Sequence, residues 1–332
     1  MYIGWVHHNI PKVFGCLAFV VNPIFVYLVF TGKSVCLGNY RFLLLYFAIF
    51  NVVYSVLEMA VPIGISCYRY CFYLILTDGF FEKASSFNHY ILTARCSMLA
   101  CSYAILISHF VFRYLVILRS KLISTGFHRF MSASFALCIF YFAFFQYVCE
   151  KWLSTSDTVM VYIKEHLQEE YGVNPNDYNM LSTIYNVGFR NSKVFRSWTG
   201  VVLLMLMSVG SISVYFIFGY KTMKKLNDAQ AHVTMSADTA TLQRKLLIAL
   251  TVQTVIPICI SFTPSLIAWF APVFNFSMGR VYNYSGTIAL SAFPFFDPVA
   301  IIIFLPVLRN RLYQSKQSGE QTGTVSIELR TV

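Results

Sequence analysis

The sequence predicts an all-α integral membrane protein in which seven transmembrane helices form one bundle. Of its 332 residues, 57% are hydrophobic and 12% are charged, whereas a soluble domain carries about 25% charged residues. Apolar runs of about 20 residues recur along the chain, and a helix of that length crosses the hydrocarbon core of a bilayer. Together these two observations exclude an ordinary soluble enzyme.

The apolar runs form a single membrane domain over residues 1–312. A short polar tail is expected over residues 1–11, and a second polar tail over 313–332 follows the last span. The longest polar stretch, 149–197, separates the fourth and fifth spans. The seven spans are predicted at about 12–31, 42–63, 90–114, 130–148, 198–220, 246–271 and 281–305.

The basic residues predict which side of the membrane each loop faces. Most of the 25 Lys and Arg lie in the loops after spans one, three and five and in the C-terminal tail. Because an excess of Lys and Arg marks the cytoplasmic side, we expect the N-terminus outside, the C-terminus and 313–332 inside, and the 149–197 loop outside. Membrane topology then explains the net charge of +11, and the lipid bilayer, not nucleic acid, is the expected partner.

One acid lies in the middle of the last span. Asp297 is the only charged residue there, and Pro298 directly after it lacks a backbone donor. A carboxylate in an apolar span is costly and is retained where it has a role. At a rise of ~1.5 Å per residue, Asn22 and Asn51 lie at a similar depth, about 15 Å from the cytoplasmic side. We therefore expect one hydrogen-bonded cluster; the alternative is that each side chain bonds its own backbone or a trapped water.

A second polar layer is predicted nearer the outside. Glu58 on span two and Arg95 on span three reach one level, so they form either an ion pair or a polar anchor in a ligand cavity. The alternative is that both extend to the lipid headgroups. Leu99 and Ser102 follow Arg95 at helical spacing, and these four residues are the candidate ligand-binding set. Pro257 is a candidate hinge in span six.

The sequence predicts no enzyme, no cofactor and no metal site. The HExxH, GxSxG and Walker patterns do not occur in it. The nine cysteines lack the paired spacing of zinc ligands. Corresponding segments broken by Gly or Pro in two halves, typical of inverted-repeat transporters, are not seen either.

Several motifs resemble those of nematode seven-transmembrane chemoreceptors of the Str/Srj type. YIGWVHHNIPKVFG near the N-terminus and SWTG at 197–200 make the Srj class the closer match. The resemblance covers about residues 1–312 and implies a GPCR-like fold. It also implies that the protein is an odorant receptor in the plasma membrane of sensory-neuron cilia and couples to a heterotrimeric G protein. The other motifs are LGNYRFLL at 37–44, FAIFNVVYSVLE at 47–58, HFVFRYL at 109–115, LQRKLLIALTVQTVIP at 242–257 and FPFFDPVAIII at 293–303.

The resemblance also implies roles for single residues. Arg113 takes the place of the arginine that closes span three, but Phe112 replaces the acid before it, so the resting state must be restrained elsewhere. Asp297 and Pro298 take the place of the family's Asn-Pro motif and, with Asn22, Asn51 and Pro257, form the expected switch. The basic residues expected to face a G protein, which could equally serve only as topology signals, are Arg113, Lys221, Lys224, Lys225, Arg244 and Lys245.

The resemblance does not determine which cysteines form the extracellular disulfide. The cysteine expected near Asn88 for a disulfide to the long loop is absent, so Cys149 is expected to pair with Cys67 or Cys71 instead.

The function expected from the sequence is detection of a small, volatile or apolar odorant in the outer half of the bundle. Its binding would move span six about its prolines and open the cytoplasmic side to the G protein. The alternatives are a seven-helix ligand-gated channel or transporter, for which the scarcity of charge along any helix face is unfavourable, and a structural membrane protein.

Overall fold

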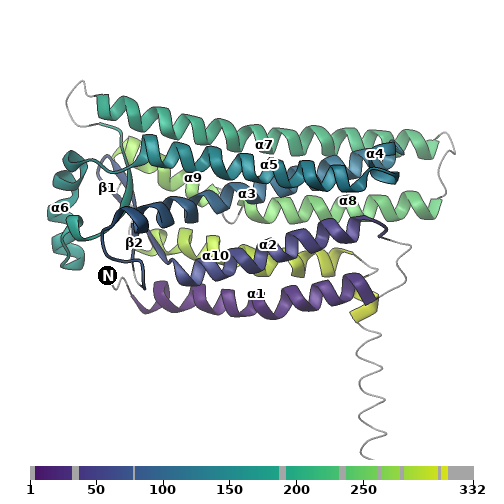
Figure 1. The fold of residues 1–332 in the computed structure, drawn as a ribbon, viewed down its shortest axis with the longest axis horizontal. Helices are drawn as coiled ribbons and strands as arrows, with labels where there is room; N and C mark the ends of the chain where they lie inside the picture. The colour runs from purple at the N-terminus through teal and green to yellow at the C-terminus, as the bar shows by residue number, and fades with distance from the viewer. Residues whose placement is uncertain are drawn as a thin grey trace, which may run out of the picture.

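The computed structural model describes residues 4–31, 37–77, 79–186, 192–231, 237–259, 263–276, 280–305 and 308–312. Long helices lie side by side in one bundle, with a small sheet across one end (Figure 1). The helices are α1 (Trp5–Thr31), α2 (Tyr40–Ala60), α3 (Ser86–Ile117), α4 (Lys121–Ser124), α5 (Phe127–Val148), α6 (Asp157–Tyr171), α7 (Ser192–Ala231), α8 (Ala237–Pro257), α9 (Thr263–Phe270) and α10 (Arg280–Phe304).

Among the described residues, six helices are long and apolar enough to cross a membrane: α1, α2, α3, α5, α7 and α10. The remaining predicted span, 246–271, corresponds to α8 and α9. α8 ends at Pro257, where the backbone lacks an N–H donor, and α9 resumes at Thr263. Within the described residues, the sixth span therefore comprises two helices, α8 and α9.

The predicted polar tail over residues 1–11 is wrong for the described part of that segment. α1 already begins at Trp5, and His7 is buried with its Nε2 3.2 Å from the Ile63 carbonyl oxygen. The apolar residues between the polar ones extend the helix, and the backbone at Ile63 supplies a partner for the imidazole.

The loops around the bundle contain a sheet that the sequence analysis did not predict. β1 (Ile63–Tyr68), β2 (Cys71–Leu76) and β3 (Met180–Ile184) form an antiparallel sheet in the order β1-β2-β3. β1 and β2 are joined by a tight turn, with Tyr68 opposite Cys71 in the register. The run ISCYRYCFYLIL, two β-prone stretches around a two-residue turn, is the signal that could have indicated this hairpin.

The sheet separates the bundle from α6. Side chains alternate across a strand, so Tyr73 and Ile75 of β2 pack on α6, which contributes Ile163 and Leu167 from one face (Figure 1). The opposite face of the β1–β2 hairpin is turned toward the bundle core. The hairpin is therefore apolar on both faces and is held between two helical layers.

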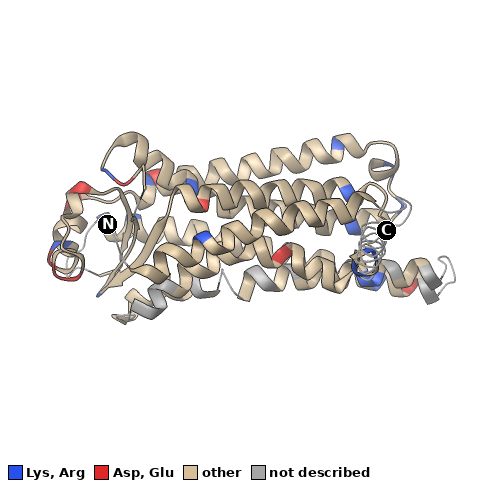
Figure 2. Cartoon of the chain, turned by 90° about the horizontal axis from the view of Figure 1, so that it is seen from below, with Lys and Arg blue, Asp and Glu red and all other residues tan. Residues whose placement is uncertain are grey.

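The two ends of the bundle differ in charge. Figure 2 shows Lys and Arg gathered at the end opposite the sheet, where few acids lie. We call the end that carries β1–β3 and α6 the sheet end, and the opposite end, where α3 finishes at Ile117, the basic end.

The expected disulfide from Cys149 to Cys67 or Cys71 is wrong, since all three are free thiols. Cys71 faces the α6 layer, whereas Cys149 begins the π-helical turn η1 (Cys149–Leu153) inside the bundle cluster. The Cys67 Sγ donates to the Ala268 carbonyl oxygen at 3.3 Å. Burial raises the pKa of Cys67 to about 12, so it is a neutral thiol at physiological pH.

The close packing of α7 on η1 predicts that Gly200→Ala destabilises the fold. A Cβ at Gly200 would lie 2.7 Å from Leu153 Cδ2 and 2.8 Å from Trp152 Cβ, and such overpacking costs about 1–3 kcal/mol. Gly210→Ala in the same helix is the control, because nothing lies within 4 Å of its Cβ position. Thermal unfolding of the solubilised protein measures both, and equal midpoints for the two variants would refute this packing.

Candidate functional site

An apolar cavity of about 60 Å³ lies between the β1–β2 hairpin and the bundle. Four hairpin side chains cover it, and helices α3, α5, α9 and α10 form its walls. Trp269 of α9 lies edge-on to Phe72 of β2, with ring centroids 6.2 Å apart. The lining residues are Ile63, Ile65, Phe72, Leu74, Cys96, Leu99, Phe145, Ala268, Trp269 and Leu290.

Leu99 is the one member of the predicted ligand-binding set that lines this cavity. Ser102 is buried, and its hydroxyl donates to the Leu99 carbonyl oxygen at 2.7 Å, so it satisfies the backbone of its own helix. Glu58 and Arg95 are not among the lining residues. Any contact of these three side chains with a ligand remains a prediction.

Glu58 and Arg95 instead form a buried ion pair that joins α2 to α3. Their side chains are 3% and 1% exposed, so neither extends to the surface of the bundle. The Arg95 guanidinium also lies 4.6 Å from the centre of the Tyr54 ring, and Tyr54 packs against Phe293 of α10 with centroids 4.5 Å apart. The pair therefore links three helices one turn from Leu99.

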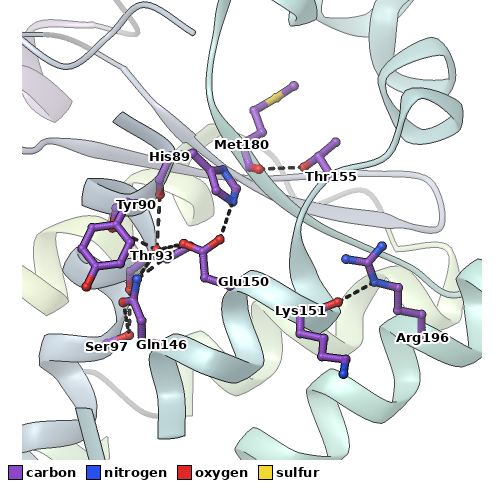
Figure 3. A network of polar contacts seen from close by, with 10 residues as sticks. All are labelled: His89, Tyr90, Thr93, Ser97, Gln146, Glu150, Lys151, Thr155, Met180 and Arg196. Atoms are coloured by element: carbon purple, nitrogen blue, oxygen red, sulfur yellow. Dashed lines mark hydrogen bonds and ion pairs between the residues drawn. The ribbon is translucent and has the colours of Figure 1, made fainter. Parts of the chain in front are cut away.

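A hydrogen-bonded network at the α3–α5 interface was not predicted from the sequence (Figure 3). Gln146 Nε2 donates to Thr93 Oγ1 at 2.6 Å, and Thr93 donates to Glu150 Oε1 at 2.6 Å. Ser97 donates to Gln146 Oε1 at 3.1 Å, and His89 lies 3.3 Å from Glu150 Oε2. The spacing of four residues from Thr93 to Ser97 and from Gln146 to Glu150 places each pair on one helix face, and this is the signal that could have indicated the network.

The network borders the cavity. Cys96 and Phe145, which line the cavity, are the chain neighbours of Ser97 and Gln146. Glu150 lies in η1, and single π-helical turns are common at functional sites. Figure 3 also shows Arg196 Nε of α7 donating to the Lys151 carbonyl oxygen at 2.8 Å, which ties η1 to the neighbouring helix.

Deeper in the bundle, Asn22, Asn51 and Asp297 are all buried, at 1%, 0% and 1% exposure. Asn22 Nδ2 donates to the carbonyl oxygens of Ala18 at 2.9 Å and Pro294 at 3.1 Å, so it connects α1 to α10. Among the described residues, neither polar atom of the Asn51 side chain has a hydrogen-bond partner, nor does Asp297 Oδ1. The prediction of one hydrogen-bonded cluster is therefore wrong, because Asn22 bonds the backbone of α10.

Asn51 and Asp297 nevertheless lie at the same depth in the bundle, because α2 packs on α10. Tyr54 of α2 contacts Phe293 of α10. Asn51 and Asp297 each lie about one turn further toward the basic end, on the same helix faces as these two rings. Pro298 follows in the interior of α10 and Pro257 ends α8; a switching role for these residues remains a prediction.

Arg113, near the basic end of α3, is 3% exposed. Its guanidinium lies 3.5 Å from the centre of the Tyr40 ring, and Nη1 donates to Gln243 Oε1 at 3.4 Å. The Tyr40 hydroxyl is 3.0 Å from His109 Nδ1. We call Arg113, Tyr40, His109 and Gln243 the arginine cluster; it joins α3 to the start of α2 and to α8.

The other basic residues expected to face a G protein are exposed. Lys221, Lys224 and Lys225 lie on α7, and Arg244 and Lys245 lie on α8. Arg113 alone of the predicted set is buried, because an aromatic ring and an amide take the place of solvent around its guanidinium.

The buried ion pair predicts a non-additive stability effect. Arg95→Met leaves the Glu58 carboxylate buried without its partner and should cost about 3–5 kcal/mol, whereas Glu58→Leu combined with Arg95→Met should cost less, because no charge remains buried. Thermal unfolding of the purified variants in detergent measures both. The single substitution Glu58→Leu completes the comparison. If the effect of the double variant equals the sum of the effects of Glu58→Leu and Arg95→Met, the two charges do not interact.

Comparison with known proteins agrees with this architecture. The family profile "Serpentine type 7TM GPCR chemoreceptor Srj" matches residues 1–312. Serpentine receptor class J-38 of Caenorhabditis elegans is 42% identical over 99% of this chain and 97% of its own length. Serpentine receptor class r-10 of C. elegans is 24% identical over 90% of this chain and 87% of its own, and the G-protein coupled receptor str-33 of C. elegans is 17% identical over 95% and 93%.

The profile and the first of these relatives both cover nearly the whole membrane domain, including the segments that form the sheet end. The chain is thus a multi-pass membrane protein with a seven-transmembrane, GPCR-like bundle, and it belongs to the Srj family of serpentine chemoreceptors.

Proposed function

We propose that this chain is a plasma-membrane odorant receptor that binds a small, apolar ligand at the sheet end and signals to a heterotrimeric G protein at the basic end. The observation that supports this is the position of α3. Leu99 on α3 lines the apolar cavity, and Arg113 on the same helix forms the arginine cluster, about 21 Å further along the helix axis. One rigid helix thus connects a ligand-sized cavity with a buried cation at the opposite end.

In the orientation that we propose, the sheet end faces outside and the basic end faces the cytoplasm. The excess of Lys and Arg at the basic end favours this orientation (Figure 2). The N-terminal end of α1 lies beside the sheet (Figure 1), so the N-terminus would be outside. By analogy with the family, the receptor would act in the cilia of sensory neurons.

The arginine cluster would restrain the resting state. A buried guanidinium is costly unless its charge and donors find partners. Here the Tyr40 ring and Gln243 Oε1 contact it from two other helices, whereas Nε and Nη2 have no hydrogen-bond partner among the described residues. An outward movement of α8 would withdraw Gln243 and leave Arg113 free to bind an acceptor on the G protein. Pro257, at the end of α8, is where such a movement could be absorbed.

The exposed lysines and Arg244 would surround that site. Lys221, Lys224 and Lys225 of α7 and Lys245 of α8 carry positive charge at the same end, and such a surface favours the approach of an acidic protein face. Asn22, Asn51, Asp297 and Pro298 lie between the two ends, and we assign them to the transmission of the conformational change.

Cells that express the chain, with and without a functional G-protein α subunit, test the proposal. We expect odorant responses only when the G protein is present, and Arg113→Ala should abolish them while the protein still reaches the cell surface. Ion currents that persist without the G protein would contradict the proposal and support a ligand-gated channel.

The restraint by the arginine cluster predicts a raised basal signal in Gln243→Ala. Loss of one hydrogen bond is worth about 1 kcal/mol, which is about a fivefold change in the ratio of resting to active receptor. A G-protein reporter without added odorant measures this ratio, and Ile248→Val, at an exposed position of α8, is the control. An unchanged basal signal in Gln243→Ala would show that the restraint lies elsewhere.

A further inference from the structure

We infer that the inner face of the β1–β2 hairpin, formed by Ile63, Ile65, Phe72 and Leu74, selects the ligand by size and by lack of charge. The ligand class is an uncharged, hydrocarbon-rich molecule of about five heavy atoms. This inference deepens the proposed function and rests on it for the statement that the bound molecule is the signalling ligand.

The hairpin covers the cavity. It supplies four of the ten lining residues, and they come from alternate positions of both strands: residues 63 and 65 of β1 and residues 72 and 74 of β2. Ile65 lies opposite Leu74 in the strand register. The intervening side chains Tyr73 and Ile75 belong to the layer under α6. One face of one hairpin therefore shapes the cavity, while the other face fixes the hairpin in place.

The size of the cavity limits the size of the ligand. A cavity of about 150 Å³ binds benzene, which has six heavy atoms, so a cavity of about 60 Å³ admits a molecule of about five heavy atoms at most. The inner face of the hairpin packs in the same apolar cluster as the surrounding helix positions. α10 approaches the hairpin closely, since a Cβ on Gly286 would lie 3.4 Å from Ile65 Cδ1. The size of the hairpin side chains therefore helps to set the space that is left between the hairpin and the helices.

The chemistry of the lining limits the charge of the ligand. Nine of the ten side chains are hydrocarbon or aromatic, and Cys96 contributes only a thiol. Glu58 and Arg95, one turn from Leu99, neutralise each other in a buried pair, and Glu150 accepts a hydrogen bond from Thr93. A charged ligand in such a lining would lose its hydration without gaining a partner, at a cost of many kcal/mol. The cavity therefore admits neutral molecules and rejects charged molecules of the same size.

Binding to the purified receptor tests this inference independently of signalling. The probes are cyclopentane and 1-butanol as small neutral molecules, butylammonium and butyrate as charged molecules of similar size, and 1-hexanol as a larger neutral one. The variants are Leu74→Phe, which fills the cavity, and Phe72→Leu, which enlarges it. Ile75→Val, on the other face of β2, is the matched control.

We expect cyclopentane and 1-butanol to raise the thermal unfolding temperature saturably, and the two charged probes to have no effect. Leu74→Phe should lose the shift, Phe72→Leu should gain a shift with 1-hexanol, and Ile75→Val should bind as the wild type does even if it is less stable. Equal binding of neutral and charged probes, no binding of either, or equal effects of Leu74→Phe and Ile75→Val would overturn the inference.

The same variants separate this inference from the proposed function. If the neutral probes bind as expected but no odorant produces a G-protein response in cells, the cavity selects its ligand as inferred and the signalling proposal fails. If odorants signal but the Leu74→Phe and Phe72→Leu variants keep the wild-type odorant profile, the receptor function holds and the hairpin is not the selecting element.

Discussion

Buried charge is the constraint on which the rest of this structure depends. Inside a membrane bundle neither lipid nor bulk water compensates a charged side chain, so a charge without a partner in the protein is costly. Glu58 and Arg95 neutralise each other between α2 and α3. Arg113 is held by the Tyr40 ring and the Gln243 amide between α3, α2 and α8. Both arrangements fix α3 to its neighbours, one near each end.

The ion pair, one turn from Leu99, accounts for the apolar character of the cavity. With Arg95 occupied by Glu58, the space around Leu99 is left to hydrocarbon and aromatic side chains. The cover of that space is a hairpin whose outer face is buried against α6, so the cover is well fixed. The polar network of Thr93, Gln146 and Glu150 then joins α3 to α5 beside the cavity.

The sequence predicted the parts of the molecule that depend on helical periodicity and hydropathy. The apolar runs indicated the spans, and depth along the helices brought Glu58 to the level of Arg95, where the structure has an ion pair. Periodicity could not predict which hydrogen bonds form at one level. Asn22 bonds the Pro294 carbonyl oxygen instead of Asp297, because the choice depends on side-chain direction.

The sheet end was missed for a different physical reason. Strands of five or six residues give a weak hydropathy signal between long helices, and the pairing of β2 with β3 joins segments far apart in the chain. The disulfide prediction failed because it used proximity to the outside alone, whereas Cys71 and Cys149 belong to different layers. The cavity lies between the hairpin and four helices, and its shape depends on side-chain packing that helical periodicity does not predict.

The central claim is that occupation of the cavity under the hairpin changes the distance between α3 and α8 at the opposite end. Spin labels introduced as unnatural amino acids at Lys121, just beyond α3, and at Arg244 of α8, both exposed, allow this distance to be measured by double electron–electron resonance. The account predicts that a small neutral molecule that stabilises the purified receptor shifts the distribution to longer distances. An unchanged distribution at saturating ligand would contradict it.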